Sequence, residues 1–245
     1  MANKGKFVVN KVRVLEVPTE SVPRTKSQIT LMQRLEFVIS LLNRLFIGFI
    51  TIYILWLCLR QNSADIPWHA CLCTLGFTCL MAEGLMAHYR GNAGTQICPR
   101  PEKTRTHWIL QLLGSLFGLA GIIVKISLEE LHFTTLHGKL GLAAFILCLI
   151  SLGSGLSSIY ATELKTHIQP LLNKTTHILL GLATFTLAML STLTAFETEL
   201  FIEYSLDAAQ FHDFRLILKI VTILIWLFSS YGPFWCLIYS KLWKR

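Results

Sequence analysis

Six long apolar runs, separated by short polar stretches, dominate this sequence. A helix needs about 20 apolar residues to cross the hydrocarbon core of a bilayer, and none of the runs is long enough for two crossings. The runs cover roughly residues 41–59, 68–88, 107–126, 137–160, 177–196 and 214–238. This pattern predicts an all-α membrane protein in which six transmembrane helices form one bundle.

The composition agrees with residence in a lipid bilayer. Only 15% of the residues are charged, against about 25% in a typical soluble domain. We expect an N-terminal tail at residues 1–36, the six-helix transmembrane domain at 37–240 and a C-terminal tail at 241–245. The start of the first span is ambiguous because Asn43 and Arg44 lie near it. Residues 29–43 could instead form an amphipathic helix on the membrane surface.

The net charge of +8 comes from Lys and Arg residues distributed among the loops as membrane topology predicts, so this charge gives no reason to expect a nucleic acid partner. Lys and Arg gather before the first run, between the second and third, after the fourth and at the C-terminus, while the alternate loops are acidic. Since loops rich in Lys and Arg stay on the cytosolic side, we expect both termini in the cytosol. The first 30 residues lack the apolar segment of a cleavable signal peptide. The pattern fits the plasma membrane and an endomembrane (endoplasmic reticulum or vesicle) equally.

Four of the eight histidines stand at the beginnings of the second, third, fourth and fifth runs. They are His69, His107, His137 and His177. On a helix, the residues that follow a given histidine by 4, 7, 11, 14 and 18 positions lie on the same face as that histidine. Sixteen of the twenty positions chosen in this way hold Gly, Ala, Ser, Thr or Cys. The other four hold Leu80, Glu83, Gln111 and Lys125.

These slim faces have two interpretations. Small residues allow membrane helices to pack closely, as in Gly-x-x-x-Gly crossings, and this suffices for Gly114 and Gly118. Four slim faces that each begin at a histidine favour a large flat cofactor between the helices. On this hypothesis the glycines leave room for a porphyrin, with Gly118 and Gly121 beside an outer haem and Gly155 beside an inner one.

The directions of the helices predict how the histidines pair. The second and fourth spans start from one side of the membrane and the third and fifth from the other, so His69 shares a depth with His137, and His107 with His177. Two facing imidazoles can hold a haem iron. One zinc or copper ion would need all its ligands close together, whereas these pairs lie most of a helix length apart. Without a C-x-x-C-H motif, any haem is non-covalent.

The residues around the four histidines resemble motifs of the cytochrome b561 family, nearest its short transmembrane reductase branch. The resemblance covers about residues 40–240 and implies six helices with two non-covalent haem b groups. It implies His69 with His137, and His107 with His177, as axial ligands. It also implies electron transfer from cytosolic ascorbate to monodehydroascorbate or a ferric chelate on the other side, and a homodimer. The motifs are W-H-A at Trp68–Ala70, R-T-H-W-I-L-Q at Arg105–Gln111, L-H-G-K-L-G at Leu136–Gly141 and T-H-I-L-L-G at Thr176–Gly181.

Further site residues follow from the resemblance. Basic residues ahead of the third and fifth spans are expected to hold ascorbate, which indicates Lys103, Arg105 and Lys174. Lys125 could pair with a haem propionate or extend to the membrane interface. An alternative function is a haem-free six-helix transporter or channel that uses the histidines and Glu83 for proton coupling.

Overall fold

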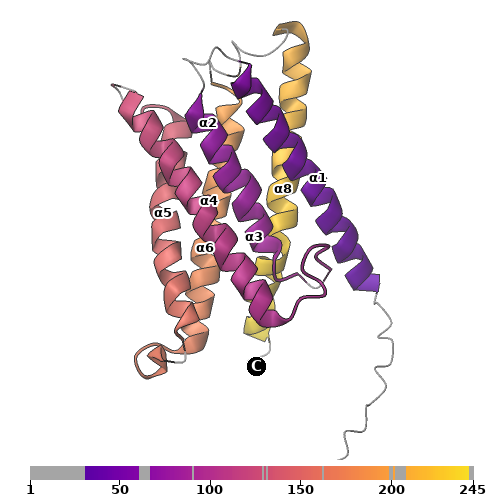
Figure 1. Cartoon of the computed structure of the whole chain (residues 1–245), viewed down its shortest axis with the longest axis vertical. Coiled ribbons are helices and arrows are strands. Elements are labelled where there is room, and N and C mark those ends of the chain that lie inside the picture. Colours follow the sequence, from indigo (N-terminus) through magenta and orange to yellow (C-terminus); the bar gives the residue numbers. More distant parts are fainter. Residues whose placement is uncertain are drawn as a thin grey trace, which may run out of the picture.

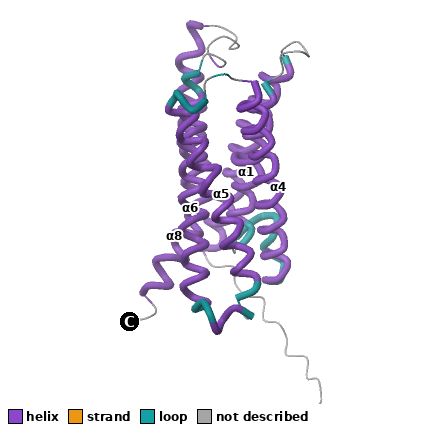
Figure 2. Tube along the Cα trace, turned by 90° about the vertical axis from the view of Figure 1, so that its left-hand side faces the viewer, coloured by secondary structure: helices purple, strands orange, loops and turns teal. Residues whose placement is uncertain are grey.

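The computed structural model describes residues 31–60, 67–89, 91–128, 130, 132–161, 163–198, 201 and 208–242. Within these residues all regular structure is helical (Figure 2). Six helical segments are long and apolar enough to cross a membrane, which confirms the predicted fold class. They are α1 (Leu31–Leu59), a composite second span made of α2 (Trp68–Cys73), the π-helix η1 (Thr74–Met81) and α3 (Ala82–Met86), then α4 (Arg100–Leu128), α5 (Leu136–Ile159), α6 (Pro170–Ala195) and α8 (Ala208–Leu242). A short 3-10 turn, η2 (Leu164–Thr166), precedes α6.

The long helices lie side by side and alternate in direction (Figure 1). The beginning of α1 and the end of α8 lie at the same end of the bundle, as an even number of crossings requires (Figure 1). We name this the Leu31 end, where α4 and α6 also begin. The opposite end, where α1 stops and α2, α5 and α8 begin, is the Leu59 end.

Helix α1 differs from the sequence expectation at its start. It is continuous from Leu31 through Asn43 and Arg44, so a separate surface helix ending at residue 43 is wrong. The polar side chains face inward and are bonded there. Asn43 Nδ2 donates to Ser229 Oγ at 2.8 Å, and Arg44 forms an ion pair with Glu83. Polar groups at membrane depth are tolerated when they have such partners in the bundle interior.

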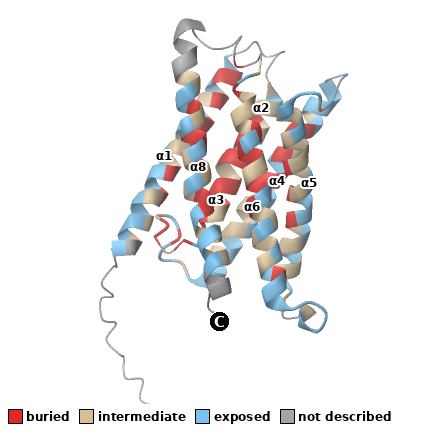
Figure 3. Ribbon diagram, turned by 180° about the vertical axis from the view of Figure 1, so that it is seen from behind, coloured by how far each residue is buried: buried red, intermediate tan, exposed pale blue. Residues whose placement is uncertain are grey.

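Burial is uneven across the bundle. In the most apolar 18 residues of the second span, 50% are buried, against 11% in α5. Figure 3 shows this contrast between the central second span and the peripheral α5. Large apolar side chains of α5, such as Ile146, Leu149 and Ile150, are exposed. In a bilayer such a surface contacts lipid.

The starts of α5 and α6 are fixed by local chemistry close to the histidines. Thr135 has extended backbone and its hydroxyl accepts a hydrogen bond from the Gly138 amide at 3.1 Å, which is the usual way to satisfy the first turn of a helix. Pro170 is the first residue of α6, a position where its missing N–H costs nothing. His137 therefore lies in a well-defined first turn of α5, and His177 lies about two turns after the start of α6.

The π-helix η1 is a feature that the sequence did not indicate. A π-helix has more residues per turn than an α-helix and is rare, so it rotates every later side chain relative to the expected register. Glu83 was expected on the face that it would share with His69. In the structure Glu83 turns to α1, and its neighbour Gly84 faces α4 instead.

Candidate functional site

Two pairs of histidine rings face one another inside the bundle. His69 of α2 and His137 of α5 have ring centroids 5.8 Å apart, near the Leu59 end. His107 of α4 and His177 of α6 have centroids 6.2 Å apart, near the Leu31 end. All four residues are half-buried. The structure thus brings the four predicted histidines together in the pairs that the helix directions require.

The Nδ1 atoms of His69, His107 and His137 each bond to a backbone carbonyl of a neighbouring helix. A carbonyl oxygen only accepts, so Nδ1 carries the proton of the neutral ring and Nε2 keeps its lone pair. A metal-binding histidine is commonly held in this way, with one nitrogen fixed by a carbonyl and the other directed to the metal. The acceptors are Gly121 O for His69 at 2.9 Å, Gly84 O for His107 at 2.8 Å and Ser191 O for His137 at 2.9 Å. The ring of His177 bonds to the backbone of Ser151, and its Nδ1 lies 3.1 Å from Ser154 Oγ, so α5 holds this ring.

The spacing within each pair suits one metal ion between two imidazoles. Metal–nitrogen bonds of about 2 Å on each side place the two ring centres about 6 Å apart. Among the residues that the structure describes, no group of three or more His, Cys, Asp or Glu side chains is placed to hold a metal. Each pair therefore supplies two ligands only. A haem fits this donor set, since its ring occupies the other positions around the iron and leaves two axial ones to the protein.

The slim faces are enclosed, but the glycines of α4 serve a different purpose from the predicted one. Of the twenty same-face positions only Lys125 is exposed. A Cβ on Gly118 would lie 2.6 Å from the Phe77 ring, and one on Gly121 would lie 2.8 Å from Cys73 Sγ. The expectation that these two glycines lie against a haem is wrong, because they allow α4 to touch the second span.

On α5 the predicted glycine does lie beside a histidine. A Cβ on Gly155 would be 3.0 Å from Cε1 of His177. A larger residue would press on this ring, so Gly155 leaves space for the imidazole of the second pair.

Basic residues gather around His88 at the Leu31 end. The ring centroid of His88 lies 5.2 Å from that of His107. Burial first, then the neighbouring His107 ring and the charges of Arg100, Lys103 and Lys174, lower the pKa of His88 to about 4. His88 is therefore neutral at pH 7, and the cluster owes its positive charge to the Arg and Lys side chains.

The predicted basic residues are not equivalent in this arrangement. Lys103 and Lys174 both lie close enough to affect His88, and Lys103 Nζ also donates to Tyr89 O at 3.2 Å. Arg105 is exposed on α4 and is not among the charges that act on His88. Sequence reasoning missed His88 and Arg100 as members of this cluster; their only signals were that His88 ends the second predicted run and that Arg100 belongs to the basic stretch before the third.

The two polar residues of the slim faces have distinct surroundings. Glu83 forms an ion pair with Arg44 at 3.0 Å, and this contact joins α3 to α1. Lys125 lies one turn after Gly121, whose carbonyl binds His69, and is exposed near the Leu59 end. Contact between Lys125 and a haem propionate stays a prediction.

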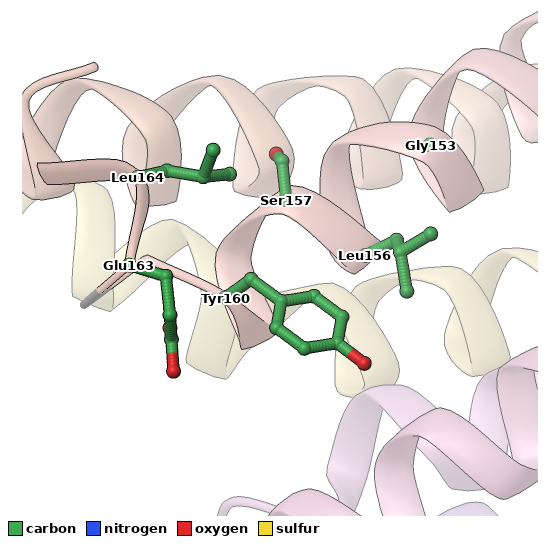
Figure 4. Close-up of a pocket in the computed structure, with 6 residues that line it drawn as sticks. All are labelled: Gly153, Leu156, Ser157, Tyr160, Glu163 and Leu164. Carbon is green, nitrogen blue, oxygen red and sulfur yellow. The ribbon is translucent and has the colours of Figure 1, made fainter. Parts of the chain in front are cut away.

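A surface pocket of about 430 Å³ lies at the end of α5. Figure 4 shows Tyr160 and Glu163 projecting beside it. One lining residue, Ser157, donates to Asn173 Oδ1 at 2.8 Å, and Asn173 is one helical turn before His177. No Lys or Arg is among the residues that line this pocket, so the pocket does not coincide with the predicted basic contacts for ascorbate. Its lining residues are Gly153, Leu156, Ser157, Tyr160, Glu163 and Leu164.

A membrane bundle with two facing imidazole pairs, one near each end, has the architecture of a multi-span haem protein. Residues 68–203 match the family model of eukaryotic cytochrome b561. The match covers more than half of the chain, and the chain belongs to the cytochrome b561 family.

The similar proteins include three mammalian sequences named transmembrane reductase CYB561D2. The mouse (Mus musculus) protein is 33% identical over 105 residues, which are 41% of this chain and 47% of the relative. The cattle (Bos taurus) and human (Homo sapiens) proteins are each 32% identical over 105 residues, with the same coverage. The chain thus spans about half the length of the relatives that it matches.

Proposed function

We propose that this protein is a di-haem transmembrane oxidoreductase that passes single electrons across the membrane. The observation that carries the proposal is the pair of facing imidazole sites, in which Nδ1 is fixed by a carbonyl and Nε2 is available. Membership of a b-type cytochrome family and the reductase name of the relatives support it. Bound haem would supply one-electron redox chemistry.

The residues of the chain would have three tasks. His69 with His137, and His107 with His177, would hold the two haem b groups non-covalently. The carbonyls at Nδ1 fix each ring and raise its basicity as a ligand. A haem held by two imidazoles would supply one-electron transfer and not substrate chemistry at the metal.

The charge distribution suggests a direction for the electron. The Leu31 end is proposed to be cytosolic, because the basic loops flank it. There Lys103 and Lys174, with Arg100, would attract the ascorbate anion beside the His107–His177 pair. Monodehydroascorbate or a ferric chelate would accept the electron at the Leu59 end. With the cytosol negative, outward transfer of an electron gains about 2.3 kcal/mol per 100 mV.

The test is to purify the protein in detergent and to record oxidised and reduced spectra with a quantitative haem assay. We expect two low-spin haems per chain, both reduced by ascorbate. His69→Ala and His107→Ala should each remove one haem and leave the other. Haem that only dithionite reduces would exclude ascorbate as the donor. A colourless, well-folded protein would contradict the proposal and favour a haem-free transporter, although Glu83 is already bonded to Arg44.

A further inference from the structure

We infer that Arg44 and Glu83, an ion pair between α1 and α3, are positioning residues for the imidazole of His107. The inference rests on the proposed function, in which His107 is a haem ligand. The two side chains do not approach the histidine themselves. They act through the backbone carbonyl of Gly84, which follows Glu83 in the chain and binds His107 Nδ1.

The ion pair has a defined geometry. Arg44 Nε lies 3.0 and 3.2 Å from the two carboxylate oxygens of Glu83, and Arg44 Nη2 lies 3.1 Å from one of them. A guanidinium that binds a carboxylate through two nitrogens restricts its orientation as well as its distance. The side chains of Arg44 and Glu83 are only 29% and 24% exposed. Glu83 is therefore held in one place relative to α1.

The same guanidinium also holds the chain that leaves α3. Arg44 Nη2 donates to Asn92 Oδ1 at 3.0 Å. Asn92 is buried, and its Nδ2 donates to Met86 O, the last residue of α3, at 2.8 Å. Arg44 thus fixes both ends of α3, through Glu83 at its start and through Asn92 at its end.

On its opposite side α3 presses against α4. His107 Nδ1 donates to Gly84 O at 2.8 Å. A Cβ on Gly84 would lie 2.8 Å from Gln111 Nε2, so the two helices meet here without space between them. The helical hydrogen bond from the Ala87 amide to the same Gly84 oxygen is 3.3 Å long. The position of this carbonyl therefore depends on where α3 as a whole is held.

The place of Gly84 at the end of its helix distinguishes the support of His107 from that of the other histidines. The carbonyls that bind His69, His137 and His177 belong to α4, α6 and α5, which have 29, 26 and 24 residues. The carbonyl that binds His107 belongs to α3, which is the last turn of the continuous 19-residue second span and directly follows a π-helix. The last turn of a helix opens most easily unless tertiary contacts hold it, and the Arg44–Glu83 pair supplies such a contact from α1.

The consequence concerns the reduction potential of the inner haem. A hydrogen bond from Nδ1 to a carbonyl makes the imidazole a more basic ligand, and a more basic ligand stabilises ferric over ferrous iron. If α3 is released, the bond weakens and the inner haem becomes easier to reduce. The outer haem, held by His69 and His137, should not respond.

The experiment uses the variant Arg44→Met with Glu83→Gln, which removes the ion pair without leaving a net charge. The inner haem is isolated in a His69→Ala background and the outer haem in a His107→Ala background. We expect the double variant to shift the ferric–ferrous equilibrium of the inner haem about tenfold toward ferrous, or about 59 mV for a one-electron couple. Its low-spin electron paramagnetic resonance signal should change too, while the outer haem keeps its potential and signal.

Four further variants sharpen the result. Glu36→Gln is the matched control, because Glu36 also joins α1 to the loop after α3, through the Gly91 amide at 3.1 Å, but does not contact α3. It should leave the inner haem unchanged. Arg44→Lys keeps the charge and loses the two-nitrogen contact, so it should shift the potential in the same direction by less. Arg44→Met alone and Glu83→Gln alone measure the contribution of charge.

The outcomes distinguish this inference from the proposed function. If the two single variants shift the potential in opposite directions and the double variant matches the parent, the pair acts by charge only and the positioning role is refuted. A shift of both haems together would also refute it, since that would indicate general loosening of the bundle. If the parent protein binds no haem, the proposed function fails before any variant is compared.

Discussion

Tyr89 is expected to hold the last helix together at its proline. Pro233 lies inside α8 and has no amide hydrogen to donate to the carbonyl four residues earlier, at Ser229. The buried Tyr89 hydroxyl lies 2.8 Å from this carbonyl oxygen and 2.8 Å from that of Phe228, and its single proton is shared between the two. It also accepts from the Gly232 amide at 2.7 Å. Tyr89→Phe would remove the donor to the Ser229 carbonyl, which Pro233 cannot replace.

The size of this effect can be worked out from the bonds lost. A buried polar group without a partner costs about 1–3 kcal/mol, and 1 kcal/mol changes the melting temperature of a chain of this size by roughly 2–4 °C. A loss of about 2 kcal/mol should lower the melting temperature of Tyr89→Phe by about 4–8 °C. The measurement is thermal unfolding in detergent, with the exposed tyrosine variant Tyr231→Phe as the control.

A second substitution tests the mechanism directly. Pro233→Ala restores an amide that can bond to Ser229 O, so in the Tyr89→Phe background it should recover part of the lost stability. Contacting residues are expected to show such non-additive effects. If Tyr89→Phe melts within about 1 °C of the parent, or if Pro233→Ala gives the same change in both backgrounds, the hydroxyl does not replace the proline amide and the argument fails.

Two other predictions concern the packing and the donor side. Gly76→Ala should destabilise the bundle markedly, because its Cβ would lie 2.5 Å from Gly114 O. Gly48→Ala has nothing within 4 Å of its Cβ and should be neutral or slightly stabilising. Thermal unfolding compares the two variants, and equal melting temperatures would contradict the close approach of the helices at Gly76. Lys174→Gln should raise the KM for ascorbate about two- to fivefold, as expected for the loss of one exposed charge worth about 0.5–1 kcal/mol. Arg105→Gln, outside the cluster around His88, should leave the KM unchanged, and an equal effect of both variants would contradict a defined donor site.

The sequence allowed the six spans and the histidine pairs to be predicted because both depend on long, regular signals. Apolar length predicts a span, and alternating helix direction then assigns His69 to the end of His137, and His107 to the end of His177. Neither inference needs the position of any single side chain. The structure agrees with both.

The sequence failed where a short-range irregularity or a long-range contact decides the result. No residue of the segment Thr74–Met81 indicates a π-helix, yet this segment turns Glu83 from the histidine face to α1. The partner of Glu83 is Arg44, 39 residues away. One ion pair therefore explains both differences from the sequence prediction: Glu83 faces α1, and Arg44 lies inside a continuous first span.

The two histidine pairs are alike in geometry but differ in what supports them. Near the Leu59 end, both Nδ1 acceptors belong to long helices, so the pair His69–His137 persists as long as α4 and α6 do. Near the Leu31 end, one acceptor belongs to α3, which is kept in place by a network that involves α1, α4 and the loop after it. The end turns of helices are among the segments that open locally at the lowest free energy. The proposed donor side of the protein is therefore also the side whose haem ligand depends on tertiary contacts, and substitutions far from the histidines, such as those at Arg44, act on one pair and spare the other.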